Sequence, residues 1–411
     1  MKPGYKQTEV GVIPEEWEVK RLGEVATIAT GNTPPTSDSS NYGDEFHFVG
    51  PVDMGDAKSI AKTEKMLSKK GFAMSRRFPK DSILFVSIGS TIGKCGIAPV
   101  ELTSNQQINA IFPSASFSAD YLFYAVSAAA PRIKAQASEQ AVPIVNKTQF
   151  SETAAAFPPL TEQRAIATAL SDVDGLLGGL DRLIAKKRDL KQAAMQQLLT
   201  GQTRIPGFHA EWEVKRLGEV GEISSAGVDK KIRPDEVPVR LVNYLDVYHK
   251  DFIYSKDLNH WVTAPPQQAK RCAVQTGDVF FTPTSETRDD IGNSAVAMED
   301  IPDAAYSYHV ARLRLHEPWD LCFRTYVFKT RAFLDQAETL CDGNGTRYVI
   351  SQGKFRSMTV QVPPLPEQTA IASVLSEMDG ELAVLEQRRE KTRALKQAMM
   401  QELLTGRTRL L

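Results

Sequence analysis

The sequence has few cysteines, no long hydrophobic run and no excess of either charge. Four cysteines lie far apart among 411 residues: Cys95, Cys272, Cys322 and Cys341. This spacing excludes a C-x2-C zinc pair and a disulfide-rich scaffold, so reduced, packed thiols are expected. The longest apolar runs, at 83–88 and 121–126, fall far short of the roughly 18 residues of a membrane span.

Charge is balanced over the whole chain and within its parts. Lysine and arginine total 49 against 50 acidic residues; residues 29–157 carry 12 against 11, and residues 224–362 carry 17 against 18. A protein that holds DNA alone usually has a net positive face, because counterion release supplies most non-specific affinity. A DNA partner would therefore need help from other subunits. The first residues lack the apolar stretch of a signal peptide, so a cytoplasmic protein is expected.

The chain contains an internal repeat. Residues 16–25 and 211–220 share the ten-residue string EWEVKRLGEV, and 28 of 48 positions are identical between 158–205 and 363–410. The stretches between these copies show little identity, yet 80–85 aligns with 277–281, 92–93 with 291–292, and Phe150 with Phe355. Repeats at a fixed period indicate repeated structural units. Two domains of one fold with different surfaces are therefore expected.

The repeated C-terminal segment predicts a long helix over 161–200, about 60 Å at 1.5 Å per residue. Proline pairs at 158–159 and 363–364 mark the starts, and Gly201 and Gly406 mark the stops. Three glycines within the first copy, Gly175, Gly178 and Gly179, favour a close helix approach or a bend.

Apolar residues in both copies repeat at a 4-3-4-3 spacing typical of a coiled-coil seam. The seam residues are Ile166, Leu170, Val173, Leu177, Leu180, Ile184, Ile371, Leu375, Met378, Leu382 and Leu385. A pseudo-twofold axis between the two copies would make the helices antiparallel. The alternative is that each helix packs only on its own domain.

Short β-branched or aromatic runs between turn residues predict strands at 82–88, 108–112, 239–245, 278–282 and 310–315. Turn residues also occur at 33–35 and 342–345. The predicted fold is α+β: two globular mixed α/β domains separated by two long helices that form an antiparallel coiled coil, with a pseudo-twofold internal repeat. The predicted boundaries are 1–157 and 206–362 for the domains, and 158–205 and 363–411 for the helices.

No catalytic motif is found. None of the proline pairs has the flanks of the Asn/Asp-Pro-Pro-aromatic motif of DNA amino-methyltransferases, and no G-x-G-x-x-G or G-x4-G-K-[ST] loop occurs. The nuclease-like strings at 18–20 and 213–215 lie inside the repeat and have no suitably placed partner carboxylate, so a structural role is favoured. The six histidines form no spaced metal pair. We expect a chain that catalyses nothing and binds no metal.

Polar residues in the variable stretches are candidates for reading bases, because Arg and Lys suit guanine edges or phosphate and Asn and Gln can pair with adenine. For any one of them a solvated or capping side chain is the simpler interpretation, and 105–107 and 343–347 can be turns. In the first domain the candidates are Asn32, Thr33, Ser87, Lys94, Asn105, Gln106, Gln107 and Lys147. In the second they are Lys230, Lys231, Arg233, Thr284, Arg288, Asn293, His309, Arg347 and Tyr348.

Together these motifs resemble the DNA-specificity subunit of type I restriction-modification systems. The resemblance is carried by PPLxEQxxIAxxL…LLTGxxR at 158–204 and 363–409, by GNTP at 31–34 and by the stretch 81–98. It implies two target-recognition domains that each read half of a bipartite, asymmetric DNA target, and a coiled-coil spacer. It also implies two methylation subunits and, in the full complex, restriction subunits. S-adenosylmethionine, ATP and magnesium would be bound by those partners and not by this chain.

Two other functions stay open at this point. A self-contained methylating or restriction enzyme is disfavoured by the missing methyltransferase motif. An assembly scaffold whose variable domains bind proteins would leave no sequence-defined footprint on DNA.

Overall fold

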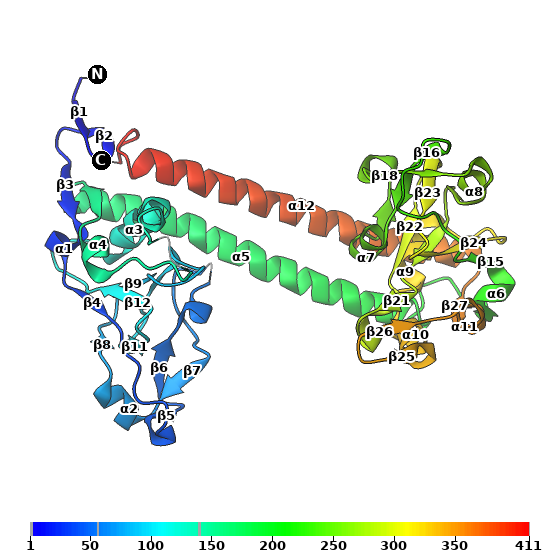
Figure 1. Ribbon diagram of the computed structural model, residues 1–411, viewed down its shortest axis with the longest axis horizontal. Coiled ribbons are helices and arrows are strands. Elements are labelled where there is room, and N and C mark those ends of the chain that lie inside the picture. The colour runs from blue at the N-terminus through cyan, green and yellow to red at the C-terminus, as the bar shows by residue number, and fades with distance from the viewer. Residues whose placement is uncertain (1–2, 56, 139–140, 411) are drawn as a thin grey trace. The chain divides into compact units, whose positions relative to one another are not determined.

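The structure is a computed structural model that describes residues 3–55, 57–138 and 141–410 (Figure 1). It divides into two compact units. The first unit comprises Met1–Arg182 and Glu386–Leu411, and the second comprises Leu183–Leu385. Helices α5 (Leu160–Leu198) and α12 (Leu365–Leu403) each contribute residues to both units.

The first unit contains two main sheets. One has the strand order β10-β9-β12-β4, with bounds Cys95–Ile97, Ile83–Val86, Ile108–Ile111 and Ile28–Thr30. The other has the order β5-β7-β6-β11-β8, with bounds Tyr42–Gly43, Lys65–Leu67, Phe46–Val49, Leu102–Ser104 and Arg77–Phe78. Two strand pairs, β1 with β2 and β3 with β13, have bounds Tyr5–Thr8, Gly11–Pro14, Glu18–Arg21 and Ala154–Phe157. The helices are α1 (Leu22–Val25), α2 (Lys69–Met74), α3 (Ala119–Lys134) and α4 (Lys147–Ser151).

The second unit repeats this plan. Its first sheet has the order β15-β24-β20-β22-β17, with bounds Gly221–Ser224, Ala311–Leu315, Val279–Phe281, Ser294–Ala297 and Phe252–Ile253. Its second has the order β18-β16-β23-β19, with bounds Trp261–Ala264, Val237–Val242, Ile301–Tyr306 and Ala273–Val274. Strand β14 (Glu213–Arg216) pairs with β27 (Thr359–Val362). The helices are α6 (Leu217–Val220), α7 (Tyr244–His249), α8 (Pro266–Arg271), α9 (Leu321–Val327), α10 (Arg331–Leu340) and α11 (Gln352–Ser357).

Matching backbone details establish the correspondence between the units. Gly93 and Gly292 both have positive φ, 103° and 86°, and an added Cβ would meet Ala130 or Ala337. Asp81 has a φ of 68°, and the equivalent turn has Gly277 at 83°. These positions require the left-handed conformation that glycine adopts without strain and Asp tolerates. All five predicted strands are present, and the prediction of one fold with two surfaces is confirmed.

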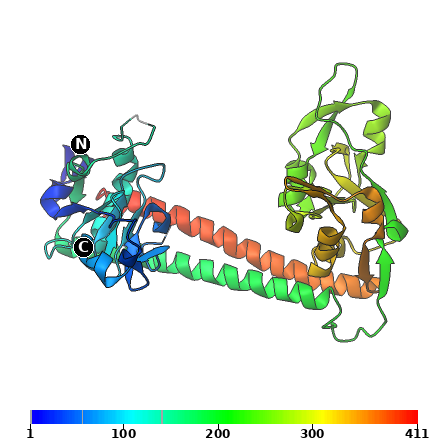
Figure 2. The same cartoon turned by 60° about the horizontal axis from the view of Figure 1, so that its bottom comes forward.

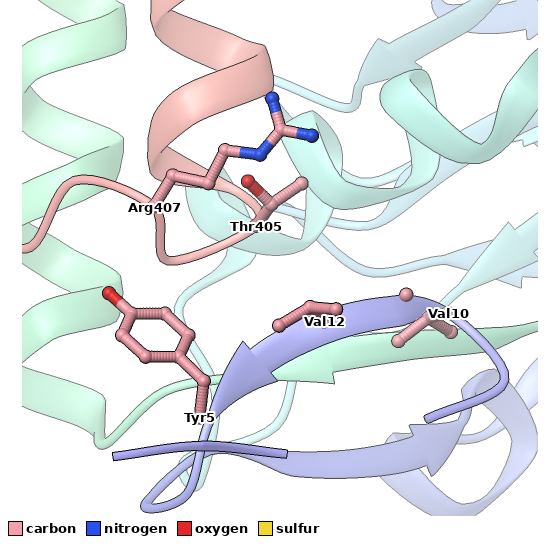
Figure 3. A pocket seen from close by; sticks show the side chains of 6 residues that line it. Tyr5, Val10, Val12, Thr405 and Arg407 are labelled. Atoms are coloured by element: carbon pink, nitrogen blue, oxygen red, sulfur yellow. The ribbon is translucent and has the colours of Figure 1, made fainter. Parts of the chain in front are cut away.

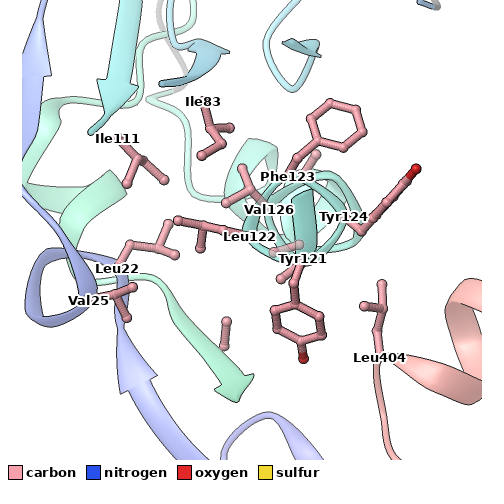
Figure 4. Packing of buried hydrophobic residues seen from close by; sticks show 14 of the residues in the cluster. Leu22, Val25, Ile83, Ile111, Tyr121, Leu122, Phe123, Tyr124, Val126 and Leu404 are labelled. Atoms are coloured by element: carbon pink, nitrogen blue, oxygen red, sulfur yellow. The ribbon is translucent and has the colours of Figure 1, made fainter. Parts of the chain in front are cut away.

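Strand β9 shows why these sequences form a buried layer. All four of its residues are buried, and successive side chains point to opposite faces. Ile83 and Phe85 join the core beneath α3, whereas Leu84 and Val86 join a second cluster that includes Phe78. Figure 4 shows the first of these clusters around α3, with Leu404 reaching it from the chain end that follows α12.

The long helices begin and end where the repeats predicted. Each has 39 residues, and Gly201 and Gly406 follow their ends with φ of 70° and 67°. Ion pairs within each unit show that the helices run antiparallel: Lys396 with Asp174 at 2.6 Å in the first unit, and Lys191 with Asp379 at 2.5 Å in the second. These two pairs occupy equivalent positions of the repeat, so the predicted antiparallel pseudo-twofold arrangement is confirmed within each unit.

The seam side chains lie on buried or half-buried positions. Ile166, Leu170, Leu180, Ile184, Ile371, Leu375 and Leu382 are buried, and Val173, Leu177, Met378 and Leu385 are half-buried. The expectation of a close helix approach at the central glycines is wrong. A Cβ added at Gly175 or Gly179 would meet no heavy atom within 4 Å, so these positions lie open.

A buried glutamate explains the repeated PPLxEQ and TR motifs. Glu162, 1% exposed, accepts from the Trp17 indole at 3.1 Å and from Arg409 at 2.6 and 2.9 Å. In the second unit Glu367, also 1% exposed, is held by Trp212 at 3.0 Å and by Arg204 at 2.6 and 2.7 Å. Two parallel N–H···O bonds to one carboxylate are the strong form of this pair. We call this arrangement the clasp; in each unit its arginine comes from the other repeat.

The neighbouring glutamine joins the helix start to the domain. Gln163 donates to the Pro158 carbonyl at 2.9 Å and accepts from the backbone of Ser118, the residue that caps α3, at 3.0 Å. Gln368 does the same with Pro363 at 2.9 Å and with Asp320, the cap of α9, at 3.0 Å. The motif therefore fixes the first turn of each long helix against the domain that precedes it.

A tyrosine cluster also recurs, although the stretches that supply the tyrosines share little sequence. Tyr124 donates to Asp174 at 2.6 Å, and Tyr326 donates to Asp379 at 2.7 Å. Lys396 and Lys191 lie over the respective rings at 5.5 and 5.4 Å. Burial is the main cause that raises the pKa of the Tyr124 and Tyr326 hydroxyls. Both phenols therefore stay protonated and can donate. Each domain therefore docks on the helices through the same polar contact.

Near the N-terminus, the strands coloured blue and the end of α12 coloured red lie together in the first unit (Figures 1 and 2). The Tyr5 hydroxyl donates to the Gly406 carbonyl at 2.9 Å. Between them lies a pocket of about 280 Å³, where Tyr5, Val10 and Val12 face Thr405 and Arg407 (Figure 3). A Cβ on Gly406 would come within 2.4 Å of Pro14, so this close approach requires glycine.

Three smaller expectations have clear outcomes. The cysteines are free thiols, buried or half-buried, as predicted. Residues 342–345 are not simply a turn: β25 (Asp342–Asn344) and β26 (Arg347–Val349) form a hairpin that pairs with β21 (Thr284–Ser285). The nuclease-like strings lie in the framework strands β3 and β14, where Lys20 pairs with Glu18 at 2.7 Å and Lys215 with Glu317 at 2.8 Å.

None of the described helices is long and apolar enough to cross a membrane.

Candidate nucleic-acid interface

Some of the candidate residues lie on one equivalent turn in each unit. In the first unit Asn105 donates its backbone N–H to Val49 at 3.1 Å and its carbonyl accepts from Ile108 at 3.3 Å. In the second, Ser307 donates to Val242 at 3.0 Å and accepts from Val310 at 2.9 Å. Both turns leave a strand of one sheet and enter a strand of the other. Gln106 and Gln107 therefore correspond to Tyr308 and His309, and we call these turns the tips.

The tip of the first unit presents amides. Thr33 donates its hydroxyl to Gln106 Oε1 at 2.7 Å, and Asn105 Nδ2 donates to Gln107 Oε1 at 3.1 Å. The side-chain oxygen of Asn105 also accepts a hydrogen bond from the Gln107 backbone N–H at 3.0 Å. This contact forms an Asx turn. Gln106 is exposed, whereas Asn105 and Gln107 are half-buried. The structure thus joins Thr33 to the tip residue Gln106, which lies 73 positions later in the sequence.

The other first-unit candidates have different settings. Asn32 accepts from the Arg76 backbone at 2.6 Å and donates to the Met74 carbonyl at 3.3 Å, so it fixes the loop after α2. Ser87 is only 2% exposed and accepts from Asn109 at 2.8 Å beneath the tip. Of these residues only the two lysines, Lys94 and Lys147, are exposed.

The tip of the second unit presents cations and an aromatic ring. Burial, followed by the charges of Lys230 and Arg347, lowers the pKa of His309. Lys230 and Arg347 therefore lie near enough for their charges to act on the imidazole, although they come from loops far apart in sequence. Both cations are exposed. The structure brings together three candidates that the sequence offered separately.

A second cation–aromatic contact lies on the hairpin of this unit. The Arg288 guanidinium lies 5.2 Å from the Tyr348 ring centroid and donates to the Glu338 carbonyl at 3.3 Å. Thr284 is half-buried on β21 and pairs with Val349 of β26. The hairpin thus holds Arg347 and Tyr348 next to the strand that follows β20.

Three candidates of the second unit are engaged in local pairs. Lys231 lies 3.4 Å from Asp229, and Arg233 lies 2.9 Å from Glu236. Asn293 donates to the Asp290 carbonyl at 3.1 Å. Exposed ion pairs contribute little to stability and exchange readily for contacts with phosphate. Lys231 and Arg233 are therefore available to bind phosphate, whereas the side chain of Asn293 is held by its hydrogen bond to Asp290.

Tyr308 is a surface residue that the sequence did not single out. Its side chain is 48% exposed, and its ring lies 3.9 Å from that of His309, centroid to centroid. The run AAYSYHV reads as a continuous strand, which conceals the turn. The available signal was the serine between the two aromatic residues. Among the described residues no group of three or more His, Cys, Asp or Glu could hold a metal ion.

The comparison with protein families agrees with this geometry. Residues 14–184 and 209–393 match the model of the type I restriction modification DNA specificity domain, one match in each repeat. The MjaVIII type I restriction enzyme specificity subunit of Methanocaldococcus jannaschii is 24% identical over 417 residues, covering 97% of this chain and 94% of the relative. The HindI specificity subunit of Haemophilus influenzae is 33% identical over 113 residues, covering 27% of this chain and 24% of the relative.

Solved structures show the same fold. A chain from the study of complex assembly and conformational transition of the type I restriction-modification system superposes with a TM-score of 0.61 at 19% identity, covering 96% of this chain and 99% of that one. The type I S subunit of M. genitalium gives 0.56 at 15% identity, covering 98% and 99%. The α+β fold with two specificity domains and long helices is therefore established.

Proposed function

The chain belongs to the type I restriction-modification DNA specificity family, and we propose that its two units each read one half of a bipartite, asymmetric DNA target. A specificity subunit directs chemistry and does not perform it. The chain therefore supplies sequence recognition to a restriction-modification complex. The alternatives of a self-contained methyltransferase and of a scaffold that binds no DNA have no support in these comparisons.

One observation carries the proposal: equivalent tips on one framework present different side chains. Gln106 and Gln107 occupy the turn positions that Tyr308 and His309 occupy in the second unit, whereas the clasp residues are the same in both units. Base edges in the major groove differ in their donors and acceptors, so amides and cations select different bases. Unlike tips predict unlike half-sites.

The proposed recognition domains span 1–157 and 206–362, and the helices of 158–205 and 363–411 connect them. The partners would be double-stranded DNA, two methylation subunits and, in a full complex, restriction subunits. Those partners would bind S-adenosylmethionine, ATP and magnesium and would act on DNA in the cytoplasm. The balanced charge of the chain, 49 basic against 50 acidic residues, fits a subunit whose partners supply part of the phosphate contacts.

The test is to express the chain with its methylation subunit in a host and to map methylated positions by long-read sequencing. The expected result is a motif of two unlike specific halves separated by unspecified bases. A palindromic motif would contradict the asymmetry, and methylation without any motif would support the scaffold alternative.

A further inference from the structure

Gln106 is the tip residue of the first unit whose hydrogen-bonding groups are best placed for an external ligand. Asn105 uses its amide nitrogen on Gln107 and its oxygen on the Gln107 backbone, so both of its polar atoms serve the turn. Gln107 is half-buried and its Oε1 accepts from Asn105. Gln106 is exposed and contacts Thr33 through Oε1 at 2.7 Å.

The hydroxyl of Thr33 fixes which way the Gln106 amide faces. A carboxamide oxygen has two lone pairs, and the nitrogen carries two hydrogens. The Thr33 hydroxyl occupies one lone pair. The second lone pair and the two N–H groups remain as an adjacent acceptor and donor. An unrestrained glutamine loses rotamer entropy when it is immobilised, and the contact with Thr33 removes part of this loss before DNA binds.

An acceptor beside a donor matches one base edge in the major groove. Adenine offers N6–H as donor and N7 as acceptor, whereas guanine offers two acceptors and cytosine a donor only. We propose that Gln106 reads an adenine in the half-site of the first unit and that Thr33 is the residue that positions its carboxamide. This inference rests on the proposed function, because it names the base that the first tip selects.

The equivalent position of the second unit gives a matched control. Tyr308 stands where Gln106 stands and offers no carboxamide. Replacing it should therefore leave the adenine of the first half-site unaffected. The same variant shows whether a change at one tip disturbs the other half-site.

The experiment measures methylation motifs and DNA affinity of the complex of the full chain with its methylation subunit. Gln106→Ala should relax one position of the first half-site from adenine to any base, a loss of about 5- to 150-fold in discrimination. Thr33→Val should weaken the same preference, and Thr33→Ser, which restores a hydroxyl, should recover it. Tyr308→Ala should change only the second half-site.

Two results would overturn the inference while leaving the proposed function intact. One is an unchanged first half-site in Gln106→Ala. The other is full adenine preference in Thr33→Val. If Gln106→Ala gave no methylation at all, binding of DNA duplexes that differ only at that adenine would decide, with Thr33→Val as the second variant. A wild-type complex without any motif would instead refute the proposed function itself.

Discussion

The two compact units differ at their tips and agree at their clasps. The first tip presents the amide of Gln106, and the second presents Tyr308 and His309 close to Lys230 and Arg347. The clasps use tryptophan, glutamate and arginine in both units with bond lengths that agree within about 0.2 Å. Positions that the framework needs are therefore repeated, whereas the tip positions, which we propose to face DNA, differ.

The largest predicted effect comes from breaking the clasp. Glu367→Gln leaves the Arg204 guanidinium without its carboxylate, and removing one partner of a buried pair costs about 3 to 5 kcal/mol. Because Arg204 is 29% exposed, we expect the low end, about 3 kcal/mol. Glu162→Gln should cost less, since Arg409 keeps Glu16 at 3.0 Å.

Amide hydrogen exchange followed by mass spectrometry measures the loss of stability in each unit, because it reports on the two units separately. Glu367→Gln should increase exchange in the second unit, and Glu162→Gln in the first. Equal changes in both units from either variant would show that the clasp does not act locally.

The second prediction concerns the charge difference between the tips. The double variant Lys230→Gln, Arg347→Gln removes two exposed cations close to His309. Each lost phosphate contact should reduce the slope of log affinity against log salt by about 0.9, so the pair should reduce it by about 1.8. Affinity at low salt should fall for all sequences alike.

A matched variant in the first unit sharpens this result. Lys94→Gln removes one exposed cation and should reduce the slope by at most about 0.9. An unchanged slope in the double variant, together with relaxed specificity at one base pair, would show that Lys230 and Arg347 contact bases and not phosphates.

Much of the fold was predictable from the sequence because the repeat identifies the framework. The helix limits followed from proline pairs and from Gly201 and Gly406, and the antiparallel pairing followed from the pseudo-twofold relation of the two repeats. The role of Glu162 was not predictable. Its partner Arg409 lies 247 positions away, and no local pattern shows that the arginine of one repeat meets the glutamate of the other.

The candidate site could be predicted from the sequence as a set of residue types, but the arrangement of those residues could not. Lys230, His309 and Arg347 were candidates for separate reasons, and only the folded turn and hairpin bring them together. Ser87 had the right chemistry but lies buried beneath the tip, because it directly follows β9, a strand that is buried on both faces. Tyr308 was missed because the four-residue turn at 307–310 contains two further aromatic residues, so the sequence between the strands resembles a continuous strand.

The third prediction tests whether the tyrosine cluster docks both domains equally. Tyr124→Phe and Tyr326→Phe each remove a hydroxyl that donates to an aspartate, at 2.6 and 2.7 Å. A hydrogen bond to a charged group contributes about 1.5 to 3 kcal/mol. Both tyrosines are buried, but the aspartates Asp174 and Asp379 are 23% and 30% exposed, so each bond should contribute about 1 to 2 kcal/mol. Urea unfolding of the two variants measures the loss. A cost in only one variant would show that the second cluster is merely a coincidence of packing.

The smallest predicted effect is a pH dependence that belongs to the second tip alone. Burial, then Lys230 and Arg347, lower the pKa of His309 from 6.5, so the imidazole is neutral at pH 7 in the free protein. Nearby DNA phosphates favour the protonated ring and should raise this pKa on binding. A complex that takes up a proton binds more tightly as pH falls, within the window between the raised pKa and the lowered one.

Affinity of the wild-type complex should therefore rise as the pH falls through the raised pKa that His309 has when bound to DNA. His309→Gln should abolish the rise. In the absence of DNA the sign is opposite, because a lowered histidine pKa makes the folded state lose stability as pH falls. Folding at pH 5.5 therefore needs to be checked by circular dichroism. A rise in affinity of equal size in the glutamine variant would mean that a group other than His309 takes up the proton. The second tip would then differ from the first in its charge but not in the pH dependence of DNA binding.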